Sequence, residues 1–201
     1  GSFSYCKNDD VNEHGVPKQF PVQNERLKTA KPDDFKKIPG SPVAYWLSSL
    51  MLNTFEKHVK STTIANSRAG MTSGNNDFFT KQWFEVISQD IKIDSEDVND
   101  ALNSKKKWFP YNKGGEGRKW YGNRDYIVNW KNNGEDIKND KLEKLKMGKC
   151  LESNSKPKNT KFYFLEHISW SLITSDPKFK VRYFENGFVF DVGAHSVFTD
   201  N

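Results

Sequence analysis

The sequence predicts an α+β fold in which an N-terminal arm and helices precede a mainly antiparallel sheet with hairpins, all in a single compact domain. Helix-like patterns lie mostly before residue 105, and strand-like runs lie mostly after it. The length of 201 residues fits one large domain, or a compact domain with an arm. Only 35% of the residues are hydrophobic, and the chain contains 15 Phe, 7 Tyr and 6 Trp. We therefore expect a core built largely from aromatic side chains.

The first elements are an arm, a turn and a helix. Residues 1–32 are polar, with scattered prolines and no sustained period, so we interpret them as an arm or linker before a domain at 33–201. The opening Gly1-Ser2 is typical of residues left by cloning, and the chain stops just after a strand-like run, so we expect a piece truncated from a longer protein. The turn signal at residues 39–42 leads into a predicted helix at 43–59 with one apolar stripe.

The remaining elements follow from local composition. Residues 61–77 are small and polar, as in a loop, a short amphipathic helix is predicted at 78–87, and the acidic stretch 90–100 indicates a loop or an exposed helix. Asn186-Gly187 favours a hairpin because this dipeptide tolerates the positive φ of a type I′ turn, so we expect residues 188–192 to return beside 179–184. An exposed, charged helix is predicted at 136–147, and strands are predicted at 107–109, 126–128, 162–164, 168–170 and 179–184.

Positive charge is concentrated in one segment. The whole chain carries a net charge of +5, whereas residues 104–124 hold seven basic side chains and one acidic one, which gives +6 and leaves −1 for the other 180 residues. Glycines at 114, 115 and 117 allow a close backbone approach to a phosphate. Basic residues that release counterions, interleaved with aromatic residues that stack, suit a polyanion. An exposed basic hairpin whose aromatic rings face the core is an equally good interpretation. The interleaved aromatic residues are Trp108, Phe109, Tyr111, Trp120 and Tyr121.

Several functional classes are disfavoured. No apolar run approaches the roughly 18 residues of a membrane span and no secretory signal opens the chain, so we expect a soluble, cytoplasmic protein without a membrane partner. Cys6 and Cys150 cannot build a disulfide scaffold, and the four scattered histidines show no metal-ligand spacing. Residues 191–194 and 114–117 only partly match cofactor and nucleotide loops, and residues 109–111 match half of a motif that grips a flipped adenine. We expect no catalytic residue, metal or cofactor in this chain.

Longer motifs are spread along most of the chain. They lie at 39–46 (PGSPVAYW), 70–76 (GMTSGNN) followed by Phe78, Phe79 and Trp83, 107–115 (KWFPYNKGG), 118–123 (RKWYGN), 128–130 (VNW), 133–135 (NGE), 168–171 (ISWS), 181–183 (VRY), Gly187 and 190–191 (FD). These motifs resemble the PglX family, the adenine-specific DNA methyltransferases of BREX phage-defence systems. The similarity runs from about residue 33 to residue 198, and Ser73 stands where the family pattern has Gly directly after Thr. The resemblance implies a region downstream of the catalytic core that belongs to target recognition, in a parent that uses S-adenosylmethionine.

This interpretation assigns roles to particular side chains. N6-adenine methylation needs the base flipped from the duplex, so a separate module must hold the DNA and read neighbouring base edges. Partners would be duplex DNA, the catalytic domain of the same parent chain, and possible further defence-system proteins. Asn75 and Asn76 could instead cap the next helix, and Arg182 could form only a cross-strand ion pair. We expect Trp120, Tyr121, Trp130 and Trp170 to lie in the core rather than on DNA. The DNA-binding candidates are Lys113, Arg118, Lys119 and Arg124 for phosphates, Asn112, Asn123, Asn75 and Asn76 for base edges or backbone, and Arg68 and Arg182 for guanine or phosphate.

Other functions remain open at this point. The same basic surface could dock another defence-system component or an acidic protein that mimics DNA. A nuclease domain is a second alternative, for which metal-dependent nicking of a plasmid is the discriminating assay. RNA binding is a third, although the sequence carries no recognisable RNA-binding signature.

Overall fold

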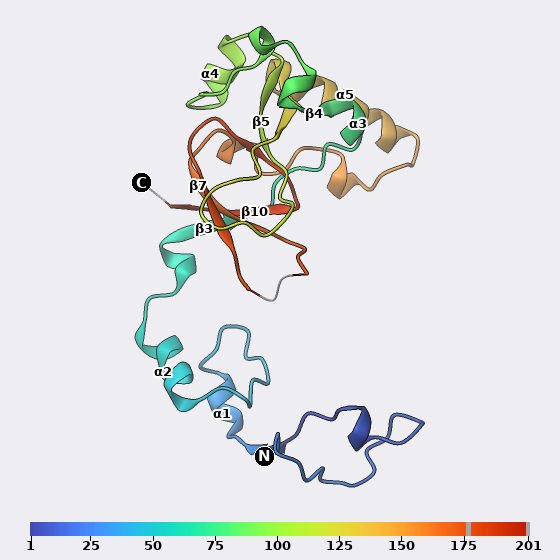
Figure 1. Cartoon of the computed structure of the whole chain (residues 1–201), viewed down its shortest axis with the longest axis vertical. Helices are drawn as coiled ribbons and strands as arrows, with labels where there is room; N and C mark the ends of the chain where they lie inside the picture. Colours follow the sequence, from blue (N-terminus) through green and yellow to red (C-terminus); the bar gives the residue numbers. More distant parts are fainter. Residues whose placement is uncertain (176–177, 200–201) are drawn as a thin grey trace. The chain divides into compact units, whose positions relative to one another are not determined.

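The structure is a computed structural model that describes residues 1–175 and 178–199. The chain divides into two compact units, residues 1–63 and residues 64–201 (Figure 1). Helices and predominantly antiparallel sheets confirm the predicted α+β class. Within the described residues, no helix is both long enough and apolar enough to cross a membrane.

The first unit includes the segment that the sequence suggested as an arm. Phe3 stacks on Tyr45 with ring centroids 5.4 Å apart and meets Phe35 edge-on at 5.5 Å. Contacts therefore group residues 1–32 with 33–63, whereas the sequence placed a boundary after residue 32. The elements of this unit are β1 (Ser2–Phe3), which pairs antiparallel with β2 (Lys28–Thr29), the 3-10 turns η1 (Asn8–Asp10) and η2 (Ser61–Thr63), and the helices α1 (Pro32–Phe35) and α2 (Ser49–Lys57).

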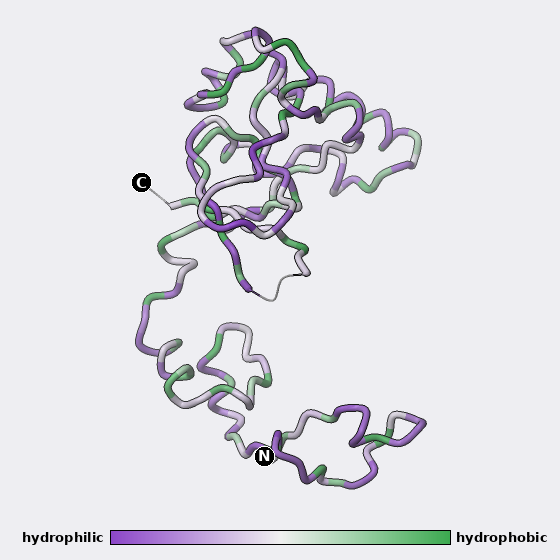
Figure 2. Tube along the Cα trace, viewed as in Figure 1, coloured by the Kyte–Doolittle hydropathy of each residue, from purple (hydrophilic) through white to green (hydrophobic). Residues whose placement is uncertain are grey.

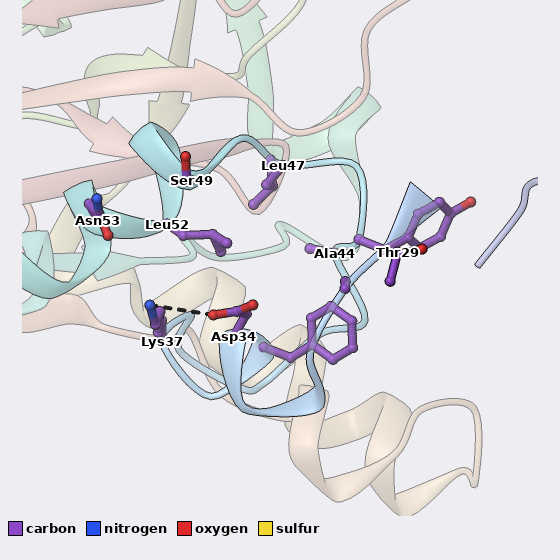
Figure 3. A pocket seen from close by; sticks show the side chains of 11 residues that line it. Thr29, Asp34, Lys37, Ala44, Leu47, Ser49, Leu52 and Asn53 are labelled. Atoms are coloured by element: carbon purple, nitrogen blue, oxygen red, sulfur yellow. Dashed lines mark ion pairs between the residues drawn. The ribbon is translucent and has the colours of Figure 1, made fainter. Parts of the chain in front are cut away.

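The helix α2 is shorter than the predicted helix at 43–59. It begins at Ser49 because the hydroxyl of Ser48 accepts a hydrogen bond from the backbone N–H of Met51 at 3.3 Å, which is an N-cap. Figure 3 shows a pocket of this unit, lined by both helices, in which Asp34 and Lys37 form an ion pair at 3.4 Å.

The second unit contains two four-stranded sheets. In the first sheet all neighbours are antiparallel, with Ser169 opposite Arg182 in one pair and Ser196 in another. In the second, Phe109 lies opposite Val128, and the last pair is parallel. The first sheet has the order β3 (Ala65–Arg68), β10 (Ala194–Thr199), β7 (His167–Ser171), β8 (Val181–Phe184), and the second has the order β4 (Thr80–Gln82), β6 (Tyr126–Asn129), β5 (Trp108–Asn112), β9 (Val189–Phe190).

Short helices and turns complete this unit. The predicted helix at 136–147 is confirmed as the main part of α5. Near the start of α5, Asn132, Asn133 and Gly134 have left-handed rather than right-handed helical backbone angles. The residues of α5 are mainly hydrophilic (Figure 2), and its buried members include Ile137. The elements are α3 (Asn76–Phe79), α4 (Val98–Asn103), α5 (Lys131–Lys146), η3 (Trp83–Glu85), η4 (Ser88–Asp90), η5 (Glu152–Asn154) and η6 (Thr160–Phe162).

The predicted hairpin at Asn186-Gly187 is wrong. Strand β9 pairs with β5 in the other sheet and not with β8, so this turn carries the chain from one sheet to the other. The backbone N–H of Gly187 donates to the carbonyl of Phe164 at 2.9 Å. With φ at 107°, Gly187 also lies so close to Ile93 that a Cβ would meet its carbonyl oxygen at 2.1 Å. Gly187 therefore meets a conformational need set by contacts with distant parts of the chain, and not by a local hairpin.

Three further local predictions are wrong, two of them because strand pairing overrides the local pattern. The predicted helix at 78–87 ends at Phe79, because Thr80–Gln82 pairs with β6 as strand β4. The predicted loop at 61–77 contains β3, which pairs with β10. The predicted strand at 162–164 is instead a 3-10 turn followed by Phe164 with φ at 71°. The other predicted strands are confirmed in part or in full by β5, β6, β7 and β8.

The core of the second unit is mainly aromatic, as the composition predicts. Trp130 meets Tyr163 edge-on at 4.9 Å, and Phe109 meets Phe164 at 5.5 Å. These side chains belong to one buried cluster that also includes Phe190 and residues from both sheets. The core therefore joins the two sheets and gives a fixed support to the loops at their ends.

Candidate nucleic-acid interface

The positively charged segment forms the loop between β5 and β6, residues 113–125, which we name the basic loop (yellow-green in Figure 1). Its first half is closed by Asn123, whose side-chain amide donates to the carbonyls of Gly114 at 2.6 Å and Glu116 at 3.0 Å. Gly114 has φ at 83°, and a Cβ there would lie 2.5 Å from the carbonyl oxygen of Gly193. The glycine is thus required by the fold of the loop itself, independently of any phosphate.

The second half of the loop is attached to the edge strand β8. The backbone N–H of Trp120 donates to the carbonyl of Val181, and the backbone N–H of Tyr183 donates to the carbonyl of Trp120, each at 3.0 Å. The hydroxyl of Ser171 donates to the carbonyl of Gly115 at 2.6 Å. These bonds make the basic loop an ordered extension of the first sheet.

The attachment leaves four consecutive side chains on the surface, which we name the exposed tip: Arg118, Lys119, Trp120 and Tyr121. Trp120 is 68% exposed and Tyr121 69% exposed, so the expectation that both lie in the core is wrong. The backbone bonds to β8 determine this outcome, because they fix the main chain against the sheet while the side chains face solvent. The same expectation is confirmed for Trp130, which is buried, whereas Trp170 is half-buried beside Phe179.

Neither cation of the exposed tip is neutralised within the described residues. Arg118 and Lys119 are exposed, and neither forms an ion pair with another described residue. Lys180, which precedes β8, lies close to the basic loop at Gly117, where a Cβ would come within 3.0 Å of the Cδ of Lys180. Ile173 and Phe179 of the loop between β7 and β8 are also exposed. No local sequence pattern marks these residues as neighbours of the basic loop, because the pairing of β7 with β8 brings their segment there.

A buried arginine lies directly behind the loop. Arg182 has 0% exposure, and its guanidinium donates to the carbonyl of Glu116 at 3.2 Å and to the hydroxyl of Ser171 at 3.1 Å. No carboxylate among the described residues pairs with it, so the suggested cross-strand ion pair is wrong. Burial, and then the nearby charge of Arg118, lower the pKa of Arg182 below its usual value. Arg182 is therefore a support of the loop and not a surface contact.

Arg124 is committed to internal contacts. Its guanidinium makes a two-pronged ion pair with Glu185, with one contact at 2.5 Å, and also donates to the carbonyl of Tyr183 at 3.1 Å. It lies 4.1 Å from the ring centroid of Tyr121. Hydrogen bonding from Arg124 lowers the pKa of Glu185 below its usual range. The structure thus gives Arg124 a bracing role where the sequence suggested a phosphate contact.

Three other candidates also have structural partners. Asn112 is fully buried, and its amide lies 3.3 Å from Nε2 of His167, so it does not reach a base edge. Asn123, described above, closes the basic loop. Arg68 on β3 donates to Ser67 and Asn66 and lies 5.0 Å from the ring of Phe162.

The remaining candidates lie near α3. Asn75 caps this helix by accepting from the N–H of Phe78 at 3.3 Å, which confirms the capping alternative for this residue. Asn76 is exposed and accepts from the hydroxyl of Ser73 at 2.6 Å. Lys113 lies over the ring of Tyr126 at 4.6 Å and lines the same open pocket as Asn76. The structure therefore brings Lys113 and Asn76 together, separately from the exposed tip.

The interior contains polar groups that the sequence reasoning missed. The hydroxyl of Tyr111 donates to Asp191 at 2.5 Å, and burial, followed by the charge of Asp191, raises the pKa of Tyr111 well above its usual value. Burial lowers the pKa of His167 to about 4, so this residue is neutral in the fold. Among the described residues, no three histidine, cysteine, aspartate or glutamate side chains are placed to hold a metal ion. These groups contribute to the interior of the fold.

Comparison with known proteins finds this chain similar to two proteins named as adenine-specific methyltransferases. No protein-family model matches it. Over 184 residues it is 42% identical to "Adenine-specific methyltransferase PglX" of Lacticaseibacillus casei (strain Zhang), and over 193 residues it is 38% identical to "Adenine-specific methyltransferase BrxX" of Escherichia coli O9:H4 (strain HS). These matches cover 90% and 96% of this chain but only 15% and 14% of the relatives. The resemblance to PglX is confirmed: along nearly its whole length the chain is related to one segment of these much longer proteins.

Proposed function

We propose that this chain, a segment related to the PglX and BrxX adenine-specific methyltransferases, is a target-recognition segment that holds and reads duplex DNA. Methylation of an adenine takes place on a base flipped out of the helix, so another surface must hold the duplex during the reaction. The catalytic domain and its S-adenosylmethionine would lie elsewhere in the parent chain. The segment would act in the cytoplasm, together with that domain and with other defence-system proteins.

The observation that carries this proposal is the unneutralised charge of the exposed tip. Arg118 and Lys119 project from a loop whose backbone is bonded to β8. Binding of a ligand therefore loses little conformational entropy through ordering of the loop. Behind them Arg182 is buried without a carboxylate partner, and its charge is poorly screened because water is excluded. A bound phosphate would neutralise this accumulated positive charge.

The two groups of candidate residues suit different tasks. Arg118 and Lys119 would contact phosphates, which fix the register of the protein on the duplex without reading sequence. Asn76 and Lys113, which share a pocket, carry the donors and acceptors that recognise base edges in the major groove. We assign base reading to this second pair.

The test is a charge reversal with a matched control. Arg118→Glu/Lys119→Glu changes the net charge by −4, and so does Lys146→Glu/Lys149→Glu, which alters exposed lysines at the end of α5 and just beyond it. Affinity for a generic duplex is measured by fluorescence anisotropy at several salt concentrations. Each lost phosphate contact should reduce the slope of log K against log salt by about 0.9, so we expect a reduction of about 2 for the first variant and little change for the second. Equal effects of the two variants would show that only net charge matters, and would refute the assigned site.

A second candidate function rests on a separate observation. Phe78, Trp83, Phe84 and Ile87 are all more than half exposed within ten residues of chain. Glu85 accepts from the backbone N–H of Gln82 and fixes this segment. Rigid, exposed aromatic side chains are typical of a protein-docking surface.

The partner of that surface would be another part of the parent methyltransferase, since the chain spans only 15% and 14% of its relatives. The test adds this chain to the parent from which the segment has been deleted. We expect wild-type chain to bind it and Trp83→Asp/Phe84→Asp to fail, with the duplex affinity of the variant unchanged. Binding by both forms would exclude this surface as the docking site.

A further inference from the structure

We infer that Trp120 is a stacking residue that inserts against an opened base step when the exposed tip holds DNA. This inference rests on the proposed function and adds the manner in which the duplex is engaged. It concerns a ring that carries no charge, so it can be tested separately from the phosphate contacts.

The backbone of Trp120 is in a conformation that its side chain does not favour. Its φ is 64°, in the left-handed region that large side chains rarely occupy and that is unfavourable for residues other than glycine. The conformation is held by the two hydrogen bonds to Val181 and Tyr183 on β8. Strain of this kind persists where the surrounding structure imposes it, and it is concentrated at functional sites.

The indole ring makes few packing contacts that would stabilise the fold. The side chain is 68% exposed, and within the described residues it makes no ring–ring or cation–ring contact. Glycine would satisfy the same backbone position without strain. A tryptophan at this place is therefore unexplained by packing, and a ligand that covers the ring would explain it.

The neighbouring Tyr121 differs from Trp120 because its ring has a partner within the fold. Its ring already has the guanidinium of Arg124 at 4.1 Å, and Arg124 is in turn held by Glu185. Tyr121 is therefore braced, whereas Trp120 is the free ring of the exposed tip.

The surroundings of Trp120 favour a nucleic acid over an apolar protein surface. Arg118 and Lys119 directly precede it, and the buried Arg182 lies on the strand to which it is bonded. Cations beside an unpaired aromatic ring match a ligand that combines phosphates with flat bases. Insertion of a large side chain between base pairs is a common way of opening a duplex, and it costs less where a pair is already weakened.

The experiment compares an intact duplex with one of equal length that carries a central mismatch. We expect wild type to bind the mismatched duplex more tightly, because less free energy is needed to unpair and unstack bases at a mismatch. Trp120→Ala should weaken binding to both by about tenfold, which is within the range for one stacked base, and should remove the preference for the mismatch. Its salt slope should stay unchanged because no charge is lost, and Trp120→Phe should recover most of the affinity. Trp46→Ala, which removes a 65% exposed tryptophan outside the basic loop, is the matched control and should bind as wild type does.

The possible results separate this inference from the proposed function. Salt-dependent binding that Trp120→Ala leaves intact would overturn the stacking role and leave the DNA-holding role standing. Absence of any salt-dependent binding by wild type would overturn both. Weakened binding in which Trp120→Phe is as poor as Trp120→Ala would also contradict stacking, because a phenyl ring still stacks. Circular dichroism of each variant shows whether its fold is retained.

Discussion

Acidification should destabilise the second unit through His167. This residue is buried where the two sheets meet, and its ring stacks on Phe184 with centroids 5.2 Å apart. The carbonyl of Leu165 can only accept, so Nδ1 carries the hydrogen at 2.9 Å and Nε2 is left to accept from the amide of Asn112 at 3.3 Å. Protonation would place a second donor against that amide in a site without water. The folded state therefore favours the neutral ring.

The sign and magnitude follow from the two pKa values. Burial lowers the pKa of His167 from its usual 6.5 to about 4 in the fold, so between these values the unfolded chain binds a proton that the folded chain does not. The part of the unfolding free energy that depends on a neutral His167 is fully present above pH 6.5, and it is lost as the pH falls from 6.5 to about 4. A difference of about 2.5 in pKa corresponds to about 3 kcal/mol of unfolding free energy. This is a large fraction of the stability of an ordinary domain.

The assay is urea denaturation followed by circular dichroism between pH 4 and pH 8. Carboxylates also titrate in this range, so wild type is compared with His167→Gln, which can keep one donor and one acceptor but does not titrate. The unfolding free energy of wild type should fall more steeply with acid, by up to about 1.4 kcal/mol per pH unit. Parallel curves for the two proteins would refute the assignment of a buried, neutral histidine.

Two further substitutions test other parts of the fold. Gly187→Ala should lower the unfolding free energy by about 3 kcal/mol, because φ is 107° and the added Cβ would meet the carbonyl of Ile93 at 2.1 Å. Urea denaturation measures this, and a loss below about 1 kcal/mol would show that the turn relaxes easily. Asn75→Ala should cost about 1 kcal/mol through loss of the α3 cap while leaving duplex affinity unchanged. A clear loss of affinity in that variant would return Asn75 to the DNA-binding residues.

The sequence was sufficient for features that depend on composition and local pattern. An aromatic core follows from the scarcity of aliphatic residues, and Trp130, Tyr163 and Phe190 confirm it. Strands β5 to β8 follow from dense runs of aromatic and β-branched residues, since such runs bury well in sheets. The charged run at 136–147 likewise predicts the exposed face of α5.

Features set by tertiary pairing could not be predicted in this way. Asn186-Gly187 has the local chemistry of a hairpin, yet its partners are Phe164 and Ile93 from distant parts of the chain. Trp120 resembles a core residue by type, but its main chain pairs with β8 and leaves the ring outside.

Among the candidate DNA contacts, burial decides the outcome. Asn112 and Arg182 are as polar as Arg118 and Lys119, but they lie inside, where the structure uses their hydrogen bonds. From the sequence all four are DNA-binding candidates, Asn112 for base edges or backbone and the three cations for phosphate or guanine. Only their positions in the fold determine which residues are buried supports and which are exposed to a ligand.

The most direct test of the central claim is the salt dependence of duplex binding by the wild-type chain. A fluorescence-anisotropy titration with a generic duplex at several salt concentrations measures it. If the exposed tip holds phosphates, affinity falls steeply and linearly in log salt as the released counterions accumulate. Affinity that is insensitive to salt, or no binding even at low salt, would contradict the DNA-holding role of this chain.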